Sequence, residues 1–334
     1  MNIVIVHSNI SIIFLKALSL TSDKSTINII VDKRFHQTYK LFNFNFKVLF
    51  EDSDFFWDYR DFCFQKKLLL NRVKFAFGEN NFHLFLPHTN NPMYAALASS
   101  DLCIKYSIYE EGFLAHSAPS EQLISINIIK KTFINFIAKG YNYFKGQWLC
   151  ESSKFNLYYY IFEGAFKNKK MRQKVNFNDT KNISTIDKNI DALLIFDALI
   201  ESHLCKEENV LKILENFINS IDFKITKLGI KFHPSSSNLI KKKILLTLKK
   251  SNINYVKIND SILLEEVILS YHISKYKFHV YGFVSSLLYY SILNNIPTHS
   301  LAVALAEIDD IFKVKSFERF KNTFPENVYN KIIC

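Results

Sequence analysis

Short apolar runs alternate with segments of helical periodicity along most of this chain, and this alternation is the feature that most restricts its fold. In the first half we expect strands at Asn2–Val6, Asn28–Val31, Phe46–Phe50, His83–Leu86 and Leu102–Tyr109, and helices at Ser11–Leu20, Phe55–Val73 and Met93–Leu97. The expected strands are apolar at nearly every position, which is typical of strands buried on both faces. The pattern therefore predicts a parallel sheet covered by helices on both sides, the α/β class of fold.

The alternation stops in a polar segment and then begins again. Residues 167–190 lack apolar periodicity, and we interpret them as a linker between a domain at 1–166 and a second at 191–334. In the second half we expect strands at Ala192–Phe196, Ile225–Phe232, Tyr255–Ile258, Phe278–Tyr281 and Thr298–Ala302, and helices at Lys206–Ile221, Leu239–Lys250, Leu263–Ser270 and Ser285–Leu293. Two such domains would leave a ligand-binding cleft between the carboxyl ends of their sheets.

The net charge of the chain does not by itself identify the class of its partners. The 334 residues carry a formal charge of +11, but the lysines are dispersed. The sequence contains no zinc-finger spacing and no aromatic RNA-binding pattern, so we expect no nucleic-acid partner. A surplus of lysine also suits anionic substrates or an anionic membrane surface.

Cysteine usage and hydropathy indicate the compartment. The five cysteines are scattered and form no Cys-x-x-Cys pair, which argues against a disulfide framework and a structural zinc site. The first residues resemble a core strand rather than a signal peptide, and no uncharged apolar stretch reaches the roughly 18 residues that span a bilayer. We therefore expect a cytoplasmic protein whose contact with the inner membrane, if it has one, is peripheral, and a homodimer is compatible with these features.

Three polar segments follow expected strands and carry the chemistry of the chain. They are Tyr109–Gly112, Lys231–Ser235 and Tyr281–Ser286. Together they offer carboxylates that can accept a proton, an imidazole that can meet a leaving phosphate, and hydroxyls with backbone N–H groups that can hold that phosphate.

The first segment contains the acidic pair Glu110 and Glu111, followed by Gly112. Neighbouring side chains on a strand point to opposite faces, so only one carboxylate can face a given cleft. Either could act as a general base, and the family resemblance described below leads us to favour Glu110. A solvated acidic turn is the ordinary alternative for such a pair.

The other two segments end in helix starts. His233 is presented beside Pro234, which ends the strand ladder, and Ser285 and Ser286 follow Gly282 at the start of an expected helix. A histidine near a helix start can donate a hydrogen bond to a phosphate, and a glycine-containing loop before a helix can bind an anion. A boundary histidine and ordinary helix caps are the structural alternatives.

Weaker candidates are one of Glu265 and Glu266 for ribose hydroxyls and His88 and Asn90 for a sugar acceptor, with His7 in a similar position after the first strand. Each of them also fits a turn or a first-turn acid. The chain has no Asp-x-Asp, His-Glu-x-x-His, Gly-x-Ser-x-Gly or Gly-x-Gly-x-x-Gly motif, which disfavours metal-dependent, serine-hydrolase and dinucleotide chemistry.

The order and spacing of the three segments resemble those of bacterial lipooligosaccharide sialyltransferases and capsular polysialyltransferases. These enzymes have an acidic-acidic-glycine motif, then a His-Pro motif, then a serine motif. Here Glu110 lies 123 residues before His233, and Ser285 follows His233 by 52 residues. The acidic pair is Glu-Glu where Asp is frequent in those families, and a proline that often precedes the Glu266 position is missing.

The resemblance implies a GT-B fold, with two Rossmann-like domains whose parallel sheets face across a cleft. It implies an inverting, metal-independent transfer of sialic acid or a related nonulosonic acid from its CMP donor to a surface-glycan acceptor, without a cofactor. The base would come from the acidic pair in an acceptor-side N-terminal domain, and a C-terminal domain would bind the donor. Donor-binding residues would be His233, Pro234, Glu266, Gly282, Ser285 and Ser286.

Two other functions stay open at this point. The same scaffold suits another nucleotide-activated donor or a polyol phosphate donor. A non-catalytic subunit that binds a nucleotide or a glycan is the alternative from a different class.

Overall fold

The computed structural model describes residues 1–21, 27–31, 47–51, 62–88, 92–111, 115, 153–166, 169–175, 184–220 and 225–323. The chain divides into two compact units, Met1–Asn178 and Asp179–Cys334. The division falls inside the range predicted as a linker. Each unit is described here by itself.

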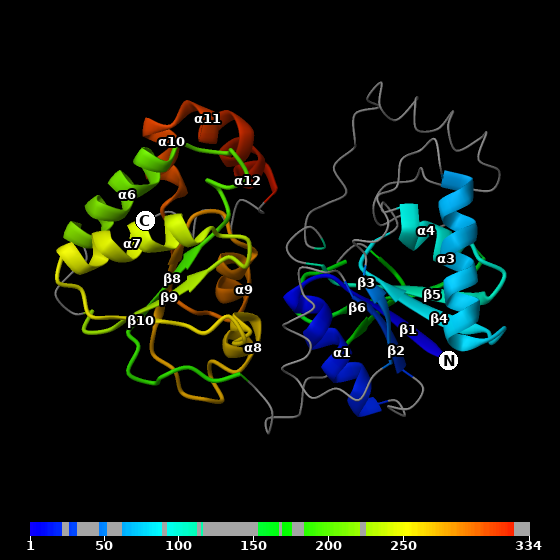
Figure 1. The fold of residues 1–334 in the computed structure, drawn as a ribbon. Coiled ribbons are helices and arrows are strands. Elements are labelled where there is room, and N and C mark those ends of the chain that lie inside the picture. Colours follow the sequence, from blue (N-terminus) through cyan, green and yellow to red (C-terminus); the bar gives the residue numbers. More distant parts are fainter. Residues whose placement is uncertain are drawn as a thin grey trace. The chain divides into compact units, whose positions relative to one another are not determined.

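The first unit contains a parallel sheet in the order β3-β2-β1-β4-β5-β6-β7 (Figure 1). The strands are β1 (Asn2–Val6), β2 (Ile27–Val31), β3 (Lys47–Glu51), β4 (Phe82–Leu86), β5 (Cys103–Tyr109), β6 (Phe155–Tyr160) and β7 (Arg172–Lys174). The helices are α1 (Asn9–Thr21), α3 (Phe62–Phe77) and α4 (Pro92–Ala98). The parallel sheet expected from the buried apolar strands is confirmed.

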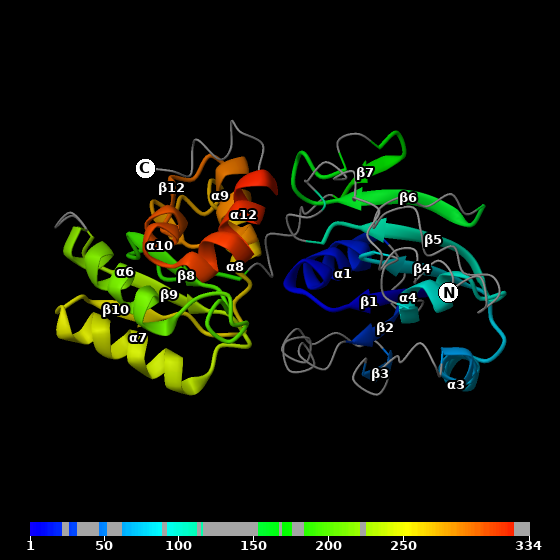
Figure 2. The ribbon, with the colours of Figure 1, turned by 90° about the horizontal axis from the view of Figure 1, so that it is seen from above.

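Helices cover this first sheet on both faces, with α1 on one side and α3 and α4 on the other (Figure 2). On the α1 side, Phe14 stacks on Tyr109 with ring centroids 4.7 Å apart and also contacts Phe85. On the opposite side, the strand residues pack with residues of α3 and α4 in one core cluster that includes Ile3, Ile5, Leu84, Leu86, Leu69, Val73 and Leu97. Successive strand residues therefore point to opposite cores, which explains why the strands are apolar throughout.

Two strands of the first sheet were not anticipated. β6 contains polar and aromatic residues instead of an aliphatic run, and β7 is a short edge strand whose three residues are all exposed. β7 pairs with β6 although it lies inside the range predicted as a linker. An exposed edge strand buries no side chain, so its sequence carries no apolar pattern.

The second unit contains a parallel sheet in the order β10-β9-β8-β11-β12. Its strands are β8 (Ala192–Phe196), β9 (Leu228–Phe232), β10 (Tyr255–Lys257), β11 (His279–Gly282) and β12 (Thr298–Ser300). The helices that follow these strands are α6 (Glu207–Ser220), α7 (Asn238–Lys250), α8 (Leu264–Leu269) and α9 (Ser286–Leu293). All five expected strands are confirmed, with ends that shift by up to three residues.

The helices of the second unit also form two layers. α6 and α7 lie together on one side of the sheet, and α8 and α9 lie together on the other (Figure 1). A C-terminal group of short helices continues beyond the sheet and contacts α6; its members are α10 (Ala302–Ile308), α11 (Asp310–Phe312), the π-helical turn Lys313–Phe317 and α12 (Glu318–Thr323). Among the described residues, no helix has the length and apolar character needed to cross a bilayer.

Both sheets reverse their strand order at one point. In the first sheet the chain runs outward from β1 to β3 on one side and from β4 onward on the other, so the reversal lies between β1 and β4. In the second sheet the reversal lies between β8 and β11. Open α/β sheets bind ligands beyond the carboxyl ends of the strands at such a reversal. The residues that follow β1, β4, β8 and β11 are therefore the first candidates for ligand binding.

Candidate active site

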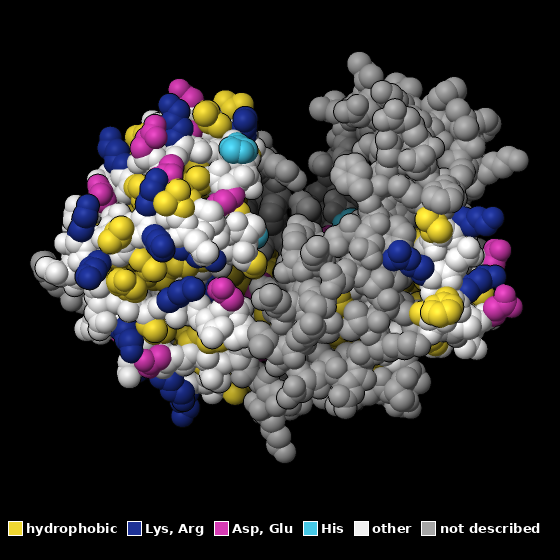
Figure 3. Space-filling view, in the orientation of Figure 1, with side chains coloured by type: hydrophobic (Ala, Val, Ile, Leu, Met, Phe, Trp, Pro, Cys, Tyr) yellow, Lys and Arg dark blue, Asp and Glu magenta, His cyan; other side chains and the backbone are white. Residues whose placement is uncertain are grey.

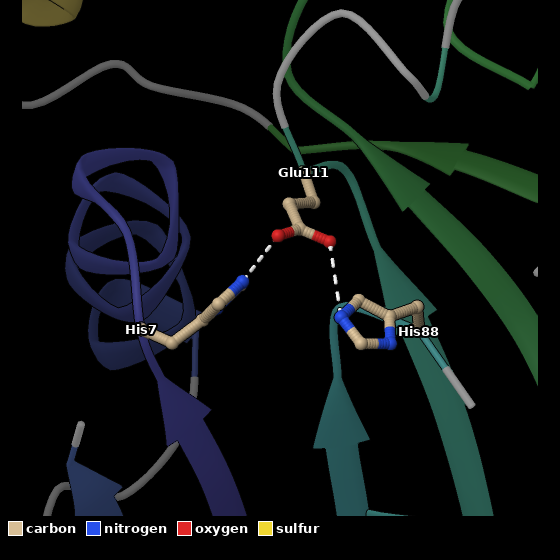
Figure 4. Close-up of side chains that lie close together, drawn as sticks. All are labelled: His7, His88 and Glu111. Atoms are coloured by element: carbon tan, nitrogen blue, oxygen red, sulfur yellow. Dashed lines mark hydrogen bonds and ion pairs between the residues drawn. The ribbon is translucent and has the colours of Figure 1, made fainter. Parts of the chain in front are cut away.

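Three titratable side chains lie together at the carboxyl edge of the first sheet. His7 follows β1, His88 follows β4 shortly after its end, and Glu111 follows β5, so they come from three neighbouring strands (Figure 4). His7 Nε2 contacts Glu111 Oε1 directly, and His88 Nε2 lies 3.5 Å from Glu111 Oε2. The Glu111 side chain keeps 22% of its surface exposed. The carboxylate lies between the two imidazoles, and its Oε2 atom is buried although the side chain as a whole is partly exposed.

Glu110 occupies a different environment from its neighbour. It has no exposed surface, and its Oε2 accepts hydrogen bonds from the backbone N–H groups of Ile161 at 2.7 Å and Phe162 at 3.0 Å. These residues follow β6, so Glu110 fixes the turn at the end of that strand. The two neighbouring side chains thus have different environments, and the partly exposed one is that of Glu111, not that of Glu110, which the sequence led us to favour.

A hydroxyl network lies behind His7. The Ser11 hydroxyl is 3.4 Å from His7 Nδ1 and accepts a hydrogen bond of 2.9 Å from the buried Tyr109 hydroxyl. On the other side of Glu111, burial lowers the pKa of His88 even though the negative charge of Glu111 opposes this shift. His88 is therefore neutral at neutral pH.

In the second unit, His233 follows β9 and is exposed. The backbone N–H of Ser235 donates to His233 Nδ1 at 3.2 Å, and the Ser235 hydroxyl lies 2.6 Å from the same nitrogen. A backbone N–H can only donate, so Nδ1 is the acceptor and the ring proton of the neutral imidazole resides on Nε2. The histidine thus presents an N–H donor of fixed tautomer at the carboxyl edge of the sheet.

The loop from β11 to α9 crosses the strand reversal of the second sheet. Ser285 caps α9 through its hydroxyl, which accepts from the backbone N–H of Leu287 at 3.4 Å. Gly282 is buried at the end of β11, and a Cβ there would lie 3.0 Å from the carbonyl oxygen of Ile195. The glycine is therefore needed for close approach of β11 to β8. Ser286, the first residue of α9, is partly exposed beside the cap.

Asp197, at the end of β8, holds this loop from the opposite side of the reversal. Its carboxylate accepts a hydrogen bond of 3.0 Å from the backbone N–H of Val284 and a further one from Ser285. Burial raises the pKa of Asp197 to about 6, although these hydrogen bonds act against the shift. Asp197 was not predicted from the sequence. The signal that could have identified it is its position directly after an apolar strand.

The raised pKa of Asp197 gives a prediction for stability. Between the ordinary pKa of 3.8 and the folded value of about 6, the folded chain binds more protons than the unfolded chain. The free energy of unfolding should therefore fall as the pH rises through this window, by about 1–3 kcal/mol. In Asp197→Asn we expect the free energy of unfolding to lack this decrease. Urea unfolding at pH 4.5 and at pH 7 measures the difference.

A matched control for this prediction lies at the other end of β8. Asp191 has a lowered pKa because hydrogen bonds from Thr226 and Lys227 outweigh the opposing effect of its partial burial. Asp191→Asn should therefore make the chain less stable at pH 7, the reverse of the effect at Asp197. Equal pH profiles for wild type and Asp197→Asn would contradict the assignment.

Other predicted site residues lie apart from these edges or in a different environment. Glu266 has no exposed surface, and its Oε2 accepts a hydrogen bond of 2.9 Å from the backbone N–H of Ser184. Glu265, beside it, is also buried, so both are acids in the first turn of α8, as the alternative had it, but neither is solvated. A ribose contact with Glu266 would require the Ser184 segment to move. Pro234 is exposed beside His233. Asn90 and Gly112 lie outside the described residues.

The fold and these two strand-end sites define a class of protein before any comparison. Two Rossmann-like units, each with titratable or hydroxyl groups at its strand reversal, are typical of the GT-B fold. The model of the alpha-2,8-polysialyltransferase family matches residues 66–303. The chain belongs to this family and is a glycosyltransferase of the sialyltransferase type.

Comparison with solved structures agrees on the fold. The chain is similar to a UDP-GlcNAc 2-epimerase from Methanocaldococcus jannaschii, with 13% identity, 99% of this chain and 98% of that chain covered, and a TM-score of 0.51. It also matches MurG from Acinetobacter baumannii, with 8% identity, 98% and 97% coverage and a TM-score of 0.39, and E. coli ADP-heptose heptosyltransferase II, with 8% identity, 90% and 84% coverage and a TM-score of 0.39. At such identity the first likeness supports the fold alone, and the lower TM-scores add nothing to it.

No match was found among curated proteins. The family match and the solved structures confirm the predicted α/β fold of the GT-B type and the resemblance to the polysialyltransferases. The cleft between the two sheets and the roles of individual residues stay predictions.

Proposed function

We propose that this glycosyltransferase moves sialic acid, or a related nonulosonic acid, from its CMP donor to a surface-glycan acceptor, with inversion at the anomeric carbon. The family to which the chain belongs supports the sugar class. The observation that carries the mechanism is the partly exposed Glu111 side chain, whose carboxylate contacts His7 and lies beside His88 at the strand reversal of the first sheet.

Glu111 is proposed as the general base of the first unit. Its Oε1 is oriented by His7, and its Oε2 lies toward His88, so the carboxylate has a fixed direction at the sheet edge. A base of this kind removes the proton from the acceptor hydroxyl as the new bond to the anomeric carbon forms. Orientation of the carboxylate before the reaction lowers the entropic cost of reaching the transition state. His88 and Asn90 remain proposed acceptor-binding residues.

The second unit is proposed to bind the donor. β9 and β11 flank β8, so His233 and the Gly282–Ser286 loop start from strands about 10 Å apart at one edge of the sheet. Side chains reaching inward from both can contact a phosphate group that lies over β8. Ser286 would hold the phosphate oxygens with its hydroxyl, and Ser285 with its backbone N–H at the start of α9, because the Ser285 hydroxyl donates to Asp197. His233 Nε2–H would donate to the oxygen that leaves with CMP.

The donor chemistry is compatible with transfer without a metal or a cofactor. CMP carries one phosphate, so only limited negative charge develops on the leaving group. A histidine N–H, serine hydroxyls and a helix N-terminus are donors that can stabilise this charge. Transfer at a crowded anomeric carbon proceeds through an oxocarbenium-like state, for which help to the leaving group is important.

Release of CMP is the direct test of this function. The purified protein is incubated with CMP-sialic acid and a panel of glycan acceptors that includes sialylated oligosaccharides. We expect acceptor-dependent release of CMP, and thermal stabilisation by CMP but not by UDP, GDP or CDP. Stabilisation by one of the other nucleotides would favour a different donor. Binding of CMP without turnover on any acceptor would favour a non-catalytic subunit.

We also propose that the enzyme contacts an anionic membrane surface through α7. One stripe of this helix, at a spacing that keeps its members on the same face, is exposed and consists of Leu239, Lys242, Leu246, Lys249 and Lys250. Figure 3 shows dark-blue lysines among yellow apolar side chains on this surface of the second unit. Lysines next to exposed leucines are typical of helices that lie on anionic bilayers.

Vesicle binding tests this surface. We expect sedimentation with vesicles that contain anionic phosphatidylglycerol, and at least a tenfold weaker partition for a Leu239→Ser/Leu246→Ser variant. A matched control is Ile311→Ser/Val314→Ser on the C-terminal helices, where exposed apolar side chains also occur. Equal loss in both variants, or binding to neutral vesicles as strong as to anionic ones, would contradict a specific role for α7.

A further inference from the structure

His7, His88 and Glu111 have the composition of a metal site as well as of a catalytic group. Their ligating atoms all lie within 4.8 Å of one another, and two imidazole nitrogens with one carboxylate oxygen are the donor set of many zinc centres. The three residues follow the carboxyl ends of three adjacent parallel strands. Figure 4 shows both rings directed at the same carboxylate.

The distances suit an ion of small radius. Zinc binds nitrogen and oxygen ligands at roughly 2.0–2.2 Å, which places ligand atoms of a tetrahedral site about 3.4 Å apart. His88 Nε2 is already 3.5 Å from Glu111 Oε2, and the rings of His7 and His88 are nearly perpendicular with centroids 5.9 Å apart. Small rotations of the side chains would bring all three atoms to one ion, without movement of the strands.

The surroundings of His7 resemble the support that a metal ligand requires. A histidine that binds a metal through one ring nitrogen usually donates its other N–H to a fixed acceptor. Ser11 Oγ lies 3.4 Å from His7 Nδ1 and is itself held by Tyr109. This hydroxyl would accept the Nδ1–H of the tautomer in which Nε2 is available to the ion.

We propose that His7, His88 and Glu111 bind a single Zn²⁺ ion, and that bound Zn²⁺ inhibits transfer because it occupies the carboxylate that would otherwise remove the acceptor proton. A fourth position would be taken by water. Binding requires the Nε2 of His7 to be free of a proton, so His7 would bind the ion as its neutral Nδ1–H tautomer. The inhibition rests on the proposed function, whereas binding of the ion does not.

Titration with Zn²⁺ alone tests the binding. The full-length protein is first freed of metal with a chelator and then titrated in competition with a chromophoric zinc indicator. We expect one tight site, a loss of affinity of more than about 100-fold in His7→Ala and in His88→Ala, and a loss of about tenfold in Ser11→Ala. With Co²⁺ as the probe, the intense visible absorption of a tetrahedral ion should appear in the wild type and disappear in His7→Ala.

The second unit provides a matched control. His279 Nδ1 and His299 Nε2 lie 3.4 Å apart in a stacked, partly exposed pair, and they could bind Zn²⁺ through two imidazoles. His279→Ala/His299→Ala should leave the tight site intact. Loss of the tight site in this double variant, or its persistence in both His7→Ala and His88→Ala, would overturn the proposal. Circular dichroism of each variant identifies any that fail to fold, and the Co²⁺ spectrum of Ser11→Ala provides an independent readout.

The activity assay separates this inference from the function on which the inhibition depends. We expect the chelator-treated enzyme to release CMP and equimolar Zn²⁺ to suppress the release. Zinc binding without any sialyl transfer would leave the site in place and refute the proposed function. Transfer that is unaffected by Zn²⁺, with no tight site in the titration, would refute this inference and leave the proposed function in place.

Discussion

Replacement of Glu111 by Gln is expected to reduce kcat for CMP release by about 10³-fold, within the range by which a general base accelerates proton transfer. The amide has the same shape and can still accept a hydrogen bond from His7, but it cannot take the acceptor proton. Stability should therefore change little. The measurement is acceptor-dependent CMP release at saturating donor, together with a thermal unfolding curve that shows the variant is folded.

Glu110→Ala is the matched control for this prediction, because the two carboxylates are neighbours with opposite environments. Removal of Glu110 leaves the backbone N–H groups of Ile161 and Phe162 buried without their acceptor, at a cost of about 2–4 kcal/mol. We expect a lower unfolding midpoint but near-normal kcat for the molecules that fold. The assignment of the base would be wrong if Glu111→Gln kept the wild-type rate, or if Glu110→Ala lost activity at full stability.

The second large effect is expected at His233. Without the Nε2–H donor, the charge on the departing phosphate is less well stabilised, and kcat should fall by about 10²–10³-fold in His233→Ala. The side chain is exposed, so the loss of folding free energy should be small. Affinity for CMP, measured by calorimetry, should weaken by no more than about tenfold, because the contact is strongest in the transition state.

Two isosteric variants sharpen this test, since the structure fixes which nitrogen carries the proton. The amide nitrogen of Gln reaches roughly the place of Nε2, and that of Asn the place of Nδ1. We therefore expect His233→Gln to recover part of the activity and His233→Asn to recover none. Ser235→Ala should have a mild effect, because the backbone N–H of Ser235 still holds Nδ1. Full transfer by His233→Ala would remove the histidine from the mechanism.

Much of the fold could be predicted from local pattern. A strand buried on both faces of a parallel sheet is apolar at every position, and this signal identified the central strands of both units. β6 and β7 were not predicted, because the first is rich in tyrosine and the second is an exposed edge strand. The short C-terminal helices were not predicted either, and the last expected strand was extended to Ala302, where α10 begins.

The candidate site could be predicted only in part. The sequence located the acidic pair, His233 and the serines, because each follows a strand and carries an unusual set of polar groups. It could not distinguish Glu110 from Glu111, since both are glutamates at the end of the same strand. It did not identify Asp197 and indicated His7 only as a weak candidate, because each is a single polar residue after an apolar run.

What the sequence determined by itself was therefore the class of fold, the family motifs and the positions along the chain where chemistry can occur, because these depend on the periodicity and spacing of neighbouring residues. Only the tertiary structure decided which strands lie side by side. That order brings His7 and His88 onto the carboxylate of Glu111, buries Glu110 under the turn after β6, and places Asp197 against the loop before α9. Burial and hydrogen bonding between residues up to about a hundred positions apart are properties of packing, and no local pattern encodes them.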